Sequence, residues 1–313
     1  MKPATTATPS TALEYRRRIC RAMNYIGAHL DRDLTLEEIA RSANFSMFHF
    51  HRVFKAVVGE TVAEFTRRLR LELAANKLIM DRRGSITEVA LSCGFSSSQN
   101  FARAFRQSFG TSPSAFRKNS KQGNIFSNRG NASSPLLQYS PDTLAIAPIA
   151  DNHQGGDTMH AAVQEMPEYH VAYVRKMGPY GKETCEQAFA ELLSWAGPRG
   201  HLASGVLLAV YWDNPEVTPA DRCRTDACLS VPPGTTTEGQ VALQTISGGP
   251  HAVCRFEITV DQFHQAWNEA FAWLVSGGHI CDDRPCFELY HNNGLEHPEG
   301  KWIIDICIPL KRV

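Results

Sequence analysis

Two stretches of the sequence, residues 46–58 and 97–109, place basic and polar side chains along one side of a predicted helix. In the first stretch, Arg52 falls opposite Phe50 and Phe54, whose helical spacing predicts a buried face. An arginine can pair with guanine, and an asparagine or glutamine with adenine, through two hydrogen bonds at the major-groove edge. We therefore expect both helices to present base-reading side chains to DNA.

The second stretch repeats this arrangement, with Gln99, Asn100 and Arg103 on the outer side and Phe101 and Phe105 on the inner side. Under a shift of 50 to 51 residues the matched pairs are Ala40 with Ala90, Phe45 with Phe95, Arg52 with Arg103, Phe54 with Phe105, Gly59 with Gly110, and Phe65 with Phe116. So many matches in one register indicate an internal duplication. An arginine at the same place in both copies favours a DNA contact over a merely solvated charge.

A short helix and a tight turn precede each of these helices. Thr35 and Glu38 have the spacing of a capping box, and the helix that they start ends near Asn44, a residue type that tolerates a left-handed turn. In the second copy, Cys93 and Gly94 supply the turn. Two helices around a tight turn, the second of them polar on its outer side, predict a helix-turn-helix unit in each copy.

The two predicted units, at about residues 35–58 and 86–109, are joined by residues 62–80, whose apolar side chains recur at helical spacing. At 1.5 Å per residue, about 18 residues span roughly 27 Å. This length is close to the ~34 Å helical repeat of DNA. Both reading helices could therefore enter successive major grooves on one face of the duplex.

Charge is divided unevenly along the 313 residues. Residues 1–121 hold 20 Lys and Arg against 10 Asp and Glu, whereas the remainder holds 12 against 22. A basic first part suits a polyanionic partner. The basic side chains predicted to contact phosphates are Lys55, Arg67, Arg68, Arg106 and Lys118, with Arg70 and Arg117 beside them.

Two motifs in the basic part have a pattern known from a family of regulators. Residues 90–117 contain GF, then S-Q-x-F-x-R-x-F, then G-x-S-P-x-x-[FY]-R, and residues 46–60 fit S-x-x-H-x-x-R-x-F-K-x-x-x-G-x. By these motifs residues 16–118 resemble the AraC/XylS family of transcription regulators. The resemblance implies seven helices, two helix-turn-helix units and a long linking helix. The bases would be contacted by Met47, Phe48, His51 and Arg52 from the first unit and by Ser98, Gln99, Asn100 and Arg103 from the second.

The rest of the chain predicts a different kind of domain. We divide the sequence into a disordered start (1–11), an all-α DNA-binding domain (12–119), a Ser-, Asn- and Gly-rich linker (120–157) and an α+β domain (158–313). Strands are expected at 170–176, 205–212, 228–231, 252–258, 286–290 and 301–310, and helices at 182–196 and 260–276. AFAELLS at 188–194 matches AFAWLVS at 270–276, which indicates two βαββ copies in an antiparallel sheet.

Glu288 is the charged residue of an otherwise apolar and aromatic strand segment, CFELY. A buried carboxylate needs a partner, and aromatic walls around it would suit a cation. An alternating strand would equally allow Glu288 to face solvent. Periodicity alone leaves both alternatives open.

Five segments of this domain form a second recognisable pattern: KMGPY at 176–180, YWDNP at 211–215, RTDAC at 224–228, FELY at 287–290 and DICIPL at 305–310. By them, residues 158–313 resemble the GyrI-like effector-binding domain. The resemblance implies a pseudo-two-fold sheet with a groove, a glutamate in the ligand pocket, and amphipathic, often cationic, small molecules as ligands. The residues predicted to contact ligand are Glu288, Tyr290, Tyr173, Tyr211, Trp212, Phe256 and Trp302.

Two alternatives remain for this domain. Some relatives of the GyrI-like domain hydrolyse small electrophiles, and Glu288 with Tyr290 or Trp302 could serve as a general base. The domain could also bind another protein, such as a polymerase or a topoisomerase. No nucleophile-elbow, P-loop or dinucleotide motif is present, so we expect no enzymatic activity and no cofactor.

The composition suits a cytoplasmic protein with reduced thiols. The start lacks the apolar core of a secretory signal, and no run of about 18 apolar residues predicts a membrane span. Neither Cys223 with Cys228 nor the cluster around Cys281 has the paired spacing of a zinc site, so we expect no metal. We predict a sequence-specific transcription regulator that binds double-stranded promoter or operator DNA as a monomer, responds to a small-molecule effector and works with RNA polymerase.

Overall fold

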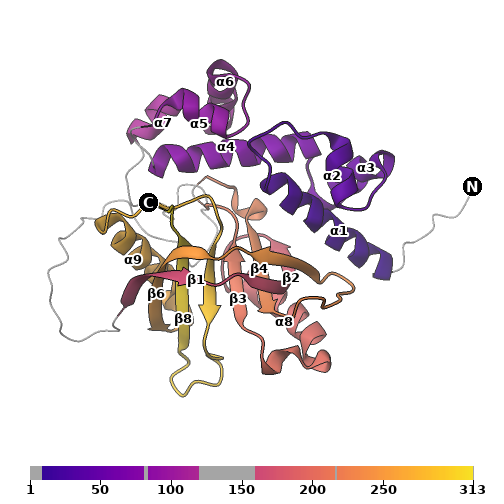
Figure 1. The fold of residues 1–313 in the computed structure, drawn as a ribbon, viewed down its shortest axis with the longest axis vertical. Helices are drawn as coiled ribbons and strands as arrows, with labels where there is room; N and C mark the ends of the chain where they lie inside the picture. Colours follow the sequence, from indigo (N-terminus) through magenta and orange to yellow (C-terminus); the bar gives the residue numbers. More distant parts are fainter. Residues whose placement is uncertain (1–8, 81–83, 120–158, 216, 313) are drawn as a thin grey trace, which may run out of the picture. The chain divides into compact units, whose positions relative to one another are not determined.

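The computed structural model describes residues 9–80, 84–119, 159–215 and 217–312. The chain divides into two compact units, of which the first holds residues 1–121 with 234–243 and the second holds the rest (Figure 1). The predicted linker, residues 120–157, lies outside the described residues. None of the described helices is long and apolar enough to cross a membrane.

Between residues 9 and 119, the described part of the first unit is helical, as predicted (Figure 1). Its helices are α1 (Pro9–Gly27), α2 (Leu36–Ser42), α3 (Met47–Val58), α4 (Val62–Met80), α5 (Ile86–Ser92), α6 (Ser98–Phe109) and α7 (Pro113–Asn119). Because α1 begins at Pro9, the prediction of disorder is wrong for the last three residues of the segment 1–11.

Local signals set the ends of these helices. The predicted capping box of Thr35 and Glu38 is present at the start of α2, and Ser85 with Glu88 repeats it at the start of α5. After α2, Asn44 has a φ of 54°, and after α5, Gly94 has a φ of 75°. Both values lie in the left-handed region. The two tight turns of the helix-turn-helix units are therefore formed as the sequence predicts.

Four phenylalanines pack in succession in each helix-turn-helix unit, and the two sets occupy matching positions of the repeat. In the first helix-turn-helix unit, the distances between successive ring centroids of Phe45, Phe50, Phe54 and Phe65 are 5.9, 5.6 and 5.5 Å. In the second, those of Phe95, Phe101, Phe105 and Phe116 follow at 5.1, 5.3 and 5.2 Å. The predicted core role of Phe50, Phe54, Phe101 and Phe105 is confirmed, since all four are fully buried.

A buried ion-pair network joins the end of α3 to α4. The guanidinium of Arg68 donates to Glu60 at 2.6 Å and to Glu72 at 3.1 Å, and all three side chains are at most 13% exposed. Burial alone would lower the pKa of Arg68, but the two carboxylates more than offset this and raise it. The arginine is therefore a fixed cation of the interior.

Replacing Arg68 by methionine should lower the free energy of unfolding of the helical unit by about 3–5 kcal/mol, because two buried carboxylates lose their cation. Arg67→Met is the matched control, since Arg67 is exposed on the same helix and a surface change of this kind costs less than about 0.5 kcal/mol. Amide hydrogen exchange of α3 and α4 in the full chain measures both. Equal protection in the two variants would contradict the network's role.

The second unit is built on one antiparallel sheet with the strand order β1-β6-β8-β7-β3-β4-β2-β5. The strands are β1 (His160–Met166), β2 (Tyr169–Met177), β3 (Leu207–Tyr211), β4 (Arg224–Ser230), β5 (Ala242–Ile246), β6 (Gly249–Ile258), β7 (Cys286–Tyr290) and β8 (Trp302–Pro309). The helices are α8 (Lys182–Ala196) and α9 (Phe263–Ser276). The two predicted βαββ copies are thus β2-α8-β3-β4 and β6-α9-β7-β8.

The sequence prediction is wrong for three strands. It lacks the two edge strands, β1 and β5, and it begins the inner strand β4 at residue 228 rather than at Arg224. Edge strand β1 is largely exposed, so it lacks the apolar alternation that marks a half-buried strand. The start of β4 reads as polar, although Arg224, Thr225 and Asp226 are all buried.

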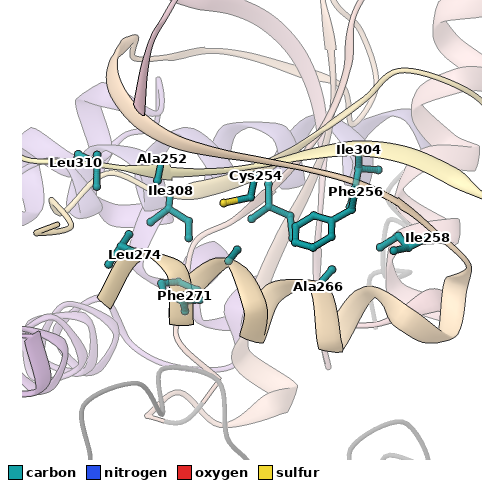
Figure 2. Close-up of a cluster of buried hydrophobic side chains, with 12 residues drawn as sticks. Ala252, Cys254, Phe256, Ile258, Ala266, Phe271, Leu274, Ile304, Ile308 and Leu310 are labelled. Atoms are coloured by element: carbon teal, nitrogen blue, oxygen red, sulfur yellow. The ribbon is translucent and has the colours of Figure 1, made fainter. Parts of the chain in front are cut away.

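Both helices pack on the same face of this sheet. Figure 2 shows α9 beneath β6 and β8, with Phe271 and Leu274 directed toward Cys254 and Ile308. Helix α8 lies over β2 and β4, and its Glu191 accepts a bond from Lys176 of β2 at 2.7 Å. The central strands β3 and β7 run between the parts of the sheet that the two helices cover.

Candidate functional sites

Helices α3 and α6 carry the predicted base-reading side chains on their exposed faces. In α3, Met47 is 43% exposed, and His51 and Arg52 are also exposed. The side chain of Phe48 lies outside the described residues. In α6, Ser98 is half-buried, and the exposed members are Gln99, Asn100 and Arg103.

The basic residues of this unit fall into two groups. Those with exposed side chains are Lys55, Arg67, Arg106 and Lys118. Arg68 was expected to contact phosphate, but that expectation conflicts with its bonds to Glu60 and Glu72. Arg70 donates to the carbonyl oxygen of Leu30, and Arg117 to that of Gly84. Part of the positive charge therefore holds the unit together.

In the second unit, Glu288 lies on the helix-covered face of β7 and is 1% exposed. Its Oε2 accepts hydrogen bonds from the hydroxyls of Tyr211 at 3.0 Å and Tyr290 at 2.5 Å. Its Oε1 accepts a bond from the indole nitrogen of Trp267 in α9 at 2.6 Å. The alternative in which Glu288 faces solvent is therefore wrong.

The hydrogen-bond partners of Glu288 are all neutral among the described residues. Burial raises the pKa of this carboxyl, and the bonds from Tyr290, Trp267 and Tyr211 oppose that rise. Donors stabilise the ionised form, but they bring no positive charge. The site can therefore gain stability from a cation.

The surroundings of Glu288 reflect the duplication of the domain. Strands β3 and β7 both end in tyrosine, so Tyr211 and Tyr290 occupy equivalent places. Ala209 of β3, the strand partner of Glu288, stands at the position equivalent to it. The duplicated sheet therefore supplies two tyrosines but one acid.

Sequence reasoning missed Trp267, because the apolar face of α9 predicts only a core. The repeat held a signal, since aligning AFAELLS with AFAWLVS places Trp267 opposite Cys185. The Cys185 sulfur lies 3.8 Å from the Tyr211 hydroxyl, and burial raises the pKa of the thiol to about 12. Cys185 is therefore a neutral thiol at physiological pH.

The other predicted ligand residues are divided between the two faces of the sheet. The Trp302 ring lies 5.6 Å from that of Tyr290, on the helix-covered face. Phe256 is on this face too, but it is 4% exposed within the core beneath α9. Tyr173 and Trp212 lie on the opposite face, so their grouping with Glu288 is wrong. The physical reason for Trp212 is that successive residues of a strand point to opposite faces.

On that opposite face, two ion pairs repeat the duplication. Arg175 and Asp226 are joined at 2.6 Å with side chains 2% and 0% exposed, and the Trp212 indole also donates to Asp226. Arg255 and Asp305 repeat the pair at 2.7 Å, but there the arginine is 52% exposed. These pairs satisfy charges on the face of the sheet opposite Glu288.

The nine cysteines all lie among the described residues, and none of them forms a disulfide. Across the described ranges, no group of three or more His, Cys, Asp or Glu side chains is placed to hold a metal ion.

Comparison with known proteins agrees with this architecture. The model of the GyrI-like small molecule binding domain matches residues 159–311, and that of a helix-turn-helix domain matches residues 39–119. A DNA gyrase inhibitor of Pantoea sp. (strain At-9b) is 32% identical over 158 residues, which are 50% of this chain and 100% of the relative. The DNA gyrase inhibitor of Escherichia coli (strain K12) is 31% identical and is covered over 98% of its length.

Solved structures resemble each unit in turn. An AraC-type transcriptional regulator from Chromobacterium violaceum is 28% identical, with a TM-score of 0.32 over 34% of this chain and 93% of that one. The C-terminal domain of EcmrR is 17% identical, with a TM-score of 0.41 over 50% of this chain and 99% of that one.

The two family models define a two-domain class of regulator, in which an AraC-type helix-turn-helix DNA-binding domain precedes a GyrI-like small molecule binding domain. The chain belongs to the GyrI-like family through its second unit.

Changing Trp267 to phenylalanine should raise the pKa of Glu288 further, because the carboxylate loses one of the three donors that lower it. Phenylalanine keeps an aromatic ring at this position, near Tyr211 and Phe271. Carbon-13 NMR titration of the glutamate carboxyl in the full chain measures the shift. Phe271→Leu, which leaves the indole donor in place, is the control. A Glu288 pKa that stays constant or falls in Trp267→Phe would show that this bond is not formed in solution.

Proposed function

We propose that this protein is a promoter-binding transcription regulator whose activity responds to a cationic or amphipathic small molecule bound at Glu288. The observation that carries the ligand class is a buried carboxylate whose partners are three neutral donors. A cation placed against it would add the charge that these donors lack, and the aromatic rings nearby would add favourable contacts.

On the DNA side, we assign phosphate contacts to Lys55, Arg67, Arg106 and Lys118. The base contacts that we assign to exposed residues of α3 and α6 are those of Met47, His51, Arg52, Gln99, Asn100 and Arg103. Exposure of these side chains supports the assignment, as does the match to a helix-turn-helix domain. Base contacts give sequence preference, whereas phosphate contacts give affinity without preference.

Arg52→Ala should weaken binding to the selected site by about 1–3 kcal/mol while changing binding to random DNA little. Lys55→Ala, one turn further along the same helix, should weaken both and reduce the slope of log affinity against log salt by about one. Fluorescence anisotropy with a site selected from a randomised duplex pool measures both effects. If Arg52→Ala leaves the ratio of specific to random affinity unchanged, Arg52 does not read a base.

Ionisation of Glu288 should control ligand binding. Because burial raises its pKa, affinity for a cation is complete above that pKa and is lost as the pH falls through it. A neutral ligand of the same shape should show no such loss.

Benzyltrimethylammonium and its neutral isostere neopentylbenzene test this difference. We expect the cation to bind more tightly, and Glu288→Gln to abolish both the preference and its pH dependence. Tryptophan fluorescence of the full chain measures binding, and Asp305→Asn, on the opposite face, is the control. Equal loss of both ligands in Glu288→Gln would make the residue structural. Binding of neither ligand would favour a protein partner, for which DNA gyrase is the target named for the relatives.

We further infer that the protein acts in the cytoplasm, on DNA, as a monomer with two reading helices, and that RNA polymerase is its partner at the promoter. The domain limits that we propose are residues 12–119 for DNA binding and 158–313 for effector binding. Two reading helices in one chain suit an asymmetric site, because each can contact a different half.

A further inference from the structure

The two helix-turn-helix units make a second connection besides the helix that joins them. Arg70, midway along α4, donates from Nε to the carbonyl oxygen of Leu30 at 2.9 Å and from Nη2 to that of Arg32 at 2.5 Å. Both carbonyls belong to the segment between α1 and α2, just before the first helix-turn-helix unit. An arginine of the linking helix therefore holds the entry to the first unit in place.

The turn of the second unit lies against the same place. A Cβ at Gly94 would lie 2.1 Å from the Leu30 carbonyl oxygen and 2.8 Å from the guanidinium carbon of Arg70. Real Cβ contacts are not this short, so only glycine allows the turn to come so close. Gly94, Arg70 and the Leu30 carbonyl form a three-part contact, which we call the clamp.

The clamp continues into both helices of the first unit's entry. The Arg32 side chain donates to the Tyr25 hydroxyl of α1 at 3.0 Å and to Glu38 of α2 at 3.2 Å. Glu38 also closes the capping box at the start of α2. The turn before α6 therefore packs on Arg70 and Leu30, and hydrogen bonds from Arg70 and Arg32 continue the connection to the start of α2.

The duplication offers an internal comparison. The residue equivalent to Gly94 in the first unit is Asn44, which has a similar left-handed backbone but is exposed. A left-handed turn alone therefore accommodates a side chain here. Close packing, and not only backbone conformation, therefore requires glycine at this turn of the second helix-turn-helix unit.

We infer that the Arg70–Gly94 clamp fixes the separation and angle between α3 and α6, and thereby the half-site spacing that the protein accepts in DNA. This inference rests on the proposed DNA-binding function. A rigid pair of reading helices rejects a site in which one inserted base pair moves and rotates one half relative to the other, by about 34° for 10.5 base pairs per turn. A loosened pair tolerates it.

The test compares spacing variants of the duplex that the full wild-type chain selects from a randomised pool. One base pair is inserted or removed at its centre, and affinity is measured by anisotropy. The wild type should lose about tenfold or more, as for a mismatched base pair, whereas Arg70→Ala and Gly94→Ala should lose less than about threefold.

Matched controls are Arg41→Ala, which removes an exposed arginine of α2, and Asn44→Ala, which strains an equivalent turn without the close contact. Both should keep the wild-type spacing profile. A uniform loss of affinity at every spacing in Arg70→Ala and Gly94→Ala would overturn the inference. So would retention of the wild-type profile.

A measurement without DNA separates the clamp from the DNA-binding proposal. Spin labels on genetically encoded ketone side chains at the exposed positions Val57 and Ser108 report the distance between α3 and α6 by double electron–electron resonance. The distribution should be narrow in wild type and broad in both clamp variants, with α4 still protected from amide exchange. Equal distributions in all proteins would overturn the clamp, even if the pool yields a site. If the pool yields no site but the distance distribution is narrow in wild type and broad in both clamp variants, only the DNA-binding proposal is rejected.

Discussion

The second unit is organised around one carboxylate that has been taken out of water. A buried charge is stable only where hydrogen-bond donors reach it, and Glu288 receives three from two strands and a helix. This need explains why Tyr211 and Tyr290 share one face, and why α9 presents an indole nitrogen rather than another aliphatic side chain. The same arrangement leaves the carboxylate satisfied in hydrogen bonds but with no cationic hydrogen-bond partner among the residues that the structure describes, which is the chemical basis of the proposed ligand class.

In the first compact unit, the corresponding constraint is that some arginines hold the fold together while others stay exposed for a polyanionic partner. Net positive charge predicts a polyanionic partner, yet net charge does not say which guanidiniums are free. Arg18, Arg70 and Arg117 donate to backbone carbonyls, and Arg68 is neutralised by buried glutamates. The basic side chains that are exposed include Lys55 of α3, Arg67 of α4, Arg106 of α6 and Lys118 of α7. A basic sequence thus overstates the charge that DNA can meet.

Periodic signals made most of the fold predictable. Apolar spacing, capping boxes and left-handed turn residues act within a few positions of one another, so α2, α3, α5 and α6 could be placed from the sequence. Contacts that depend on long-range geometry could not. Trp212 was grouped with Tyr211 although adjacent strand residues face opposite ways, and which of them faces the helices depends on the register of the whole sheet. The bonds of Arg68 were equally invisible, because helical spacing marks Glu72 as its neighbour but only the packed loop brings Glu60 beside it.

The duplicated strands β3 and β7 carry a tyrosine at equivalent positions, but only β7 carries an acid, since Ala209 of β3 stands at the position of Glu288. Two acids side by side would have repelled each other and shared a proton. With one acid, the two ends of this part of the helix-covered face differ in charge, although the strands beneath them are equivalent. At the proposed site, an elongated ligand with one cationic end would therefore bind in a single orientation. A duplicated scaffold with one carboxylate would thus distinguish the two ends of its ligand.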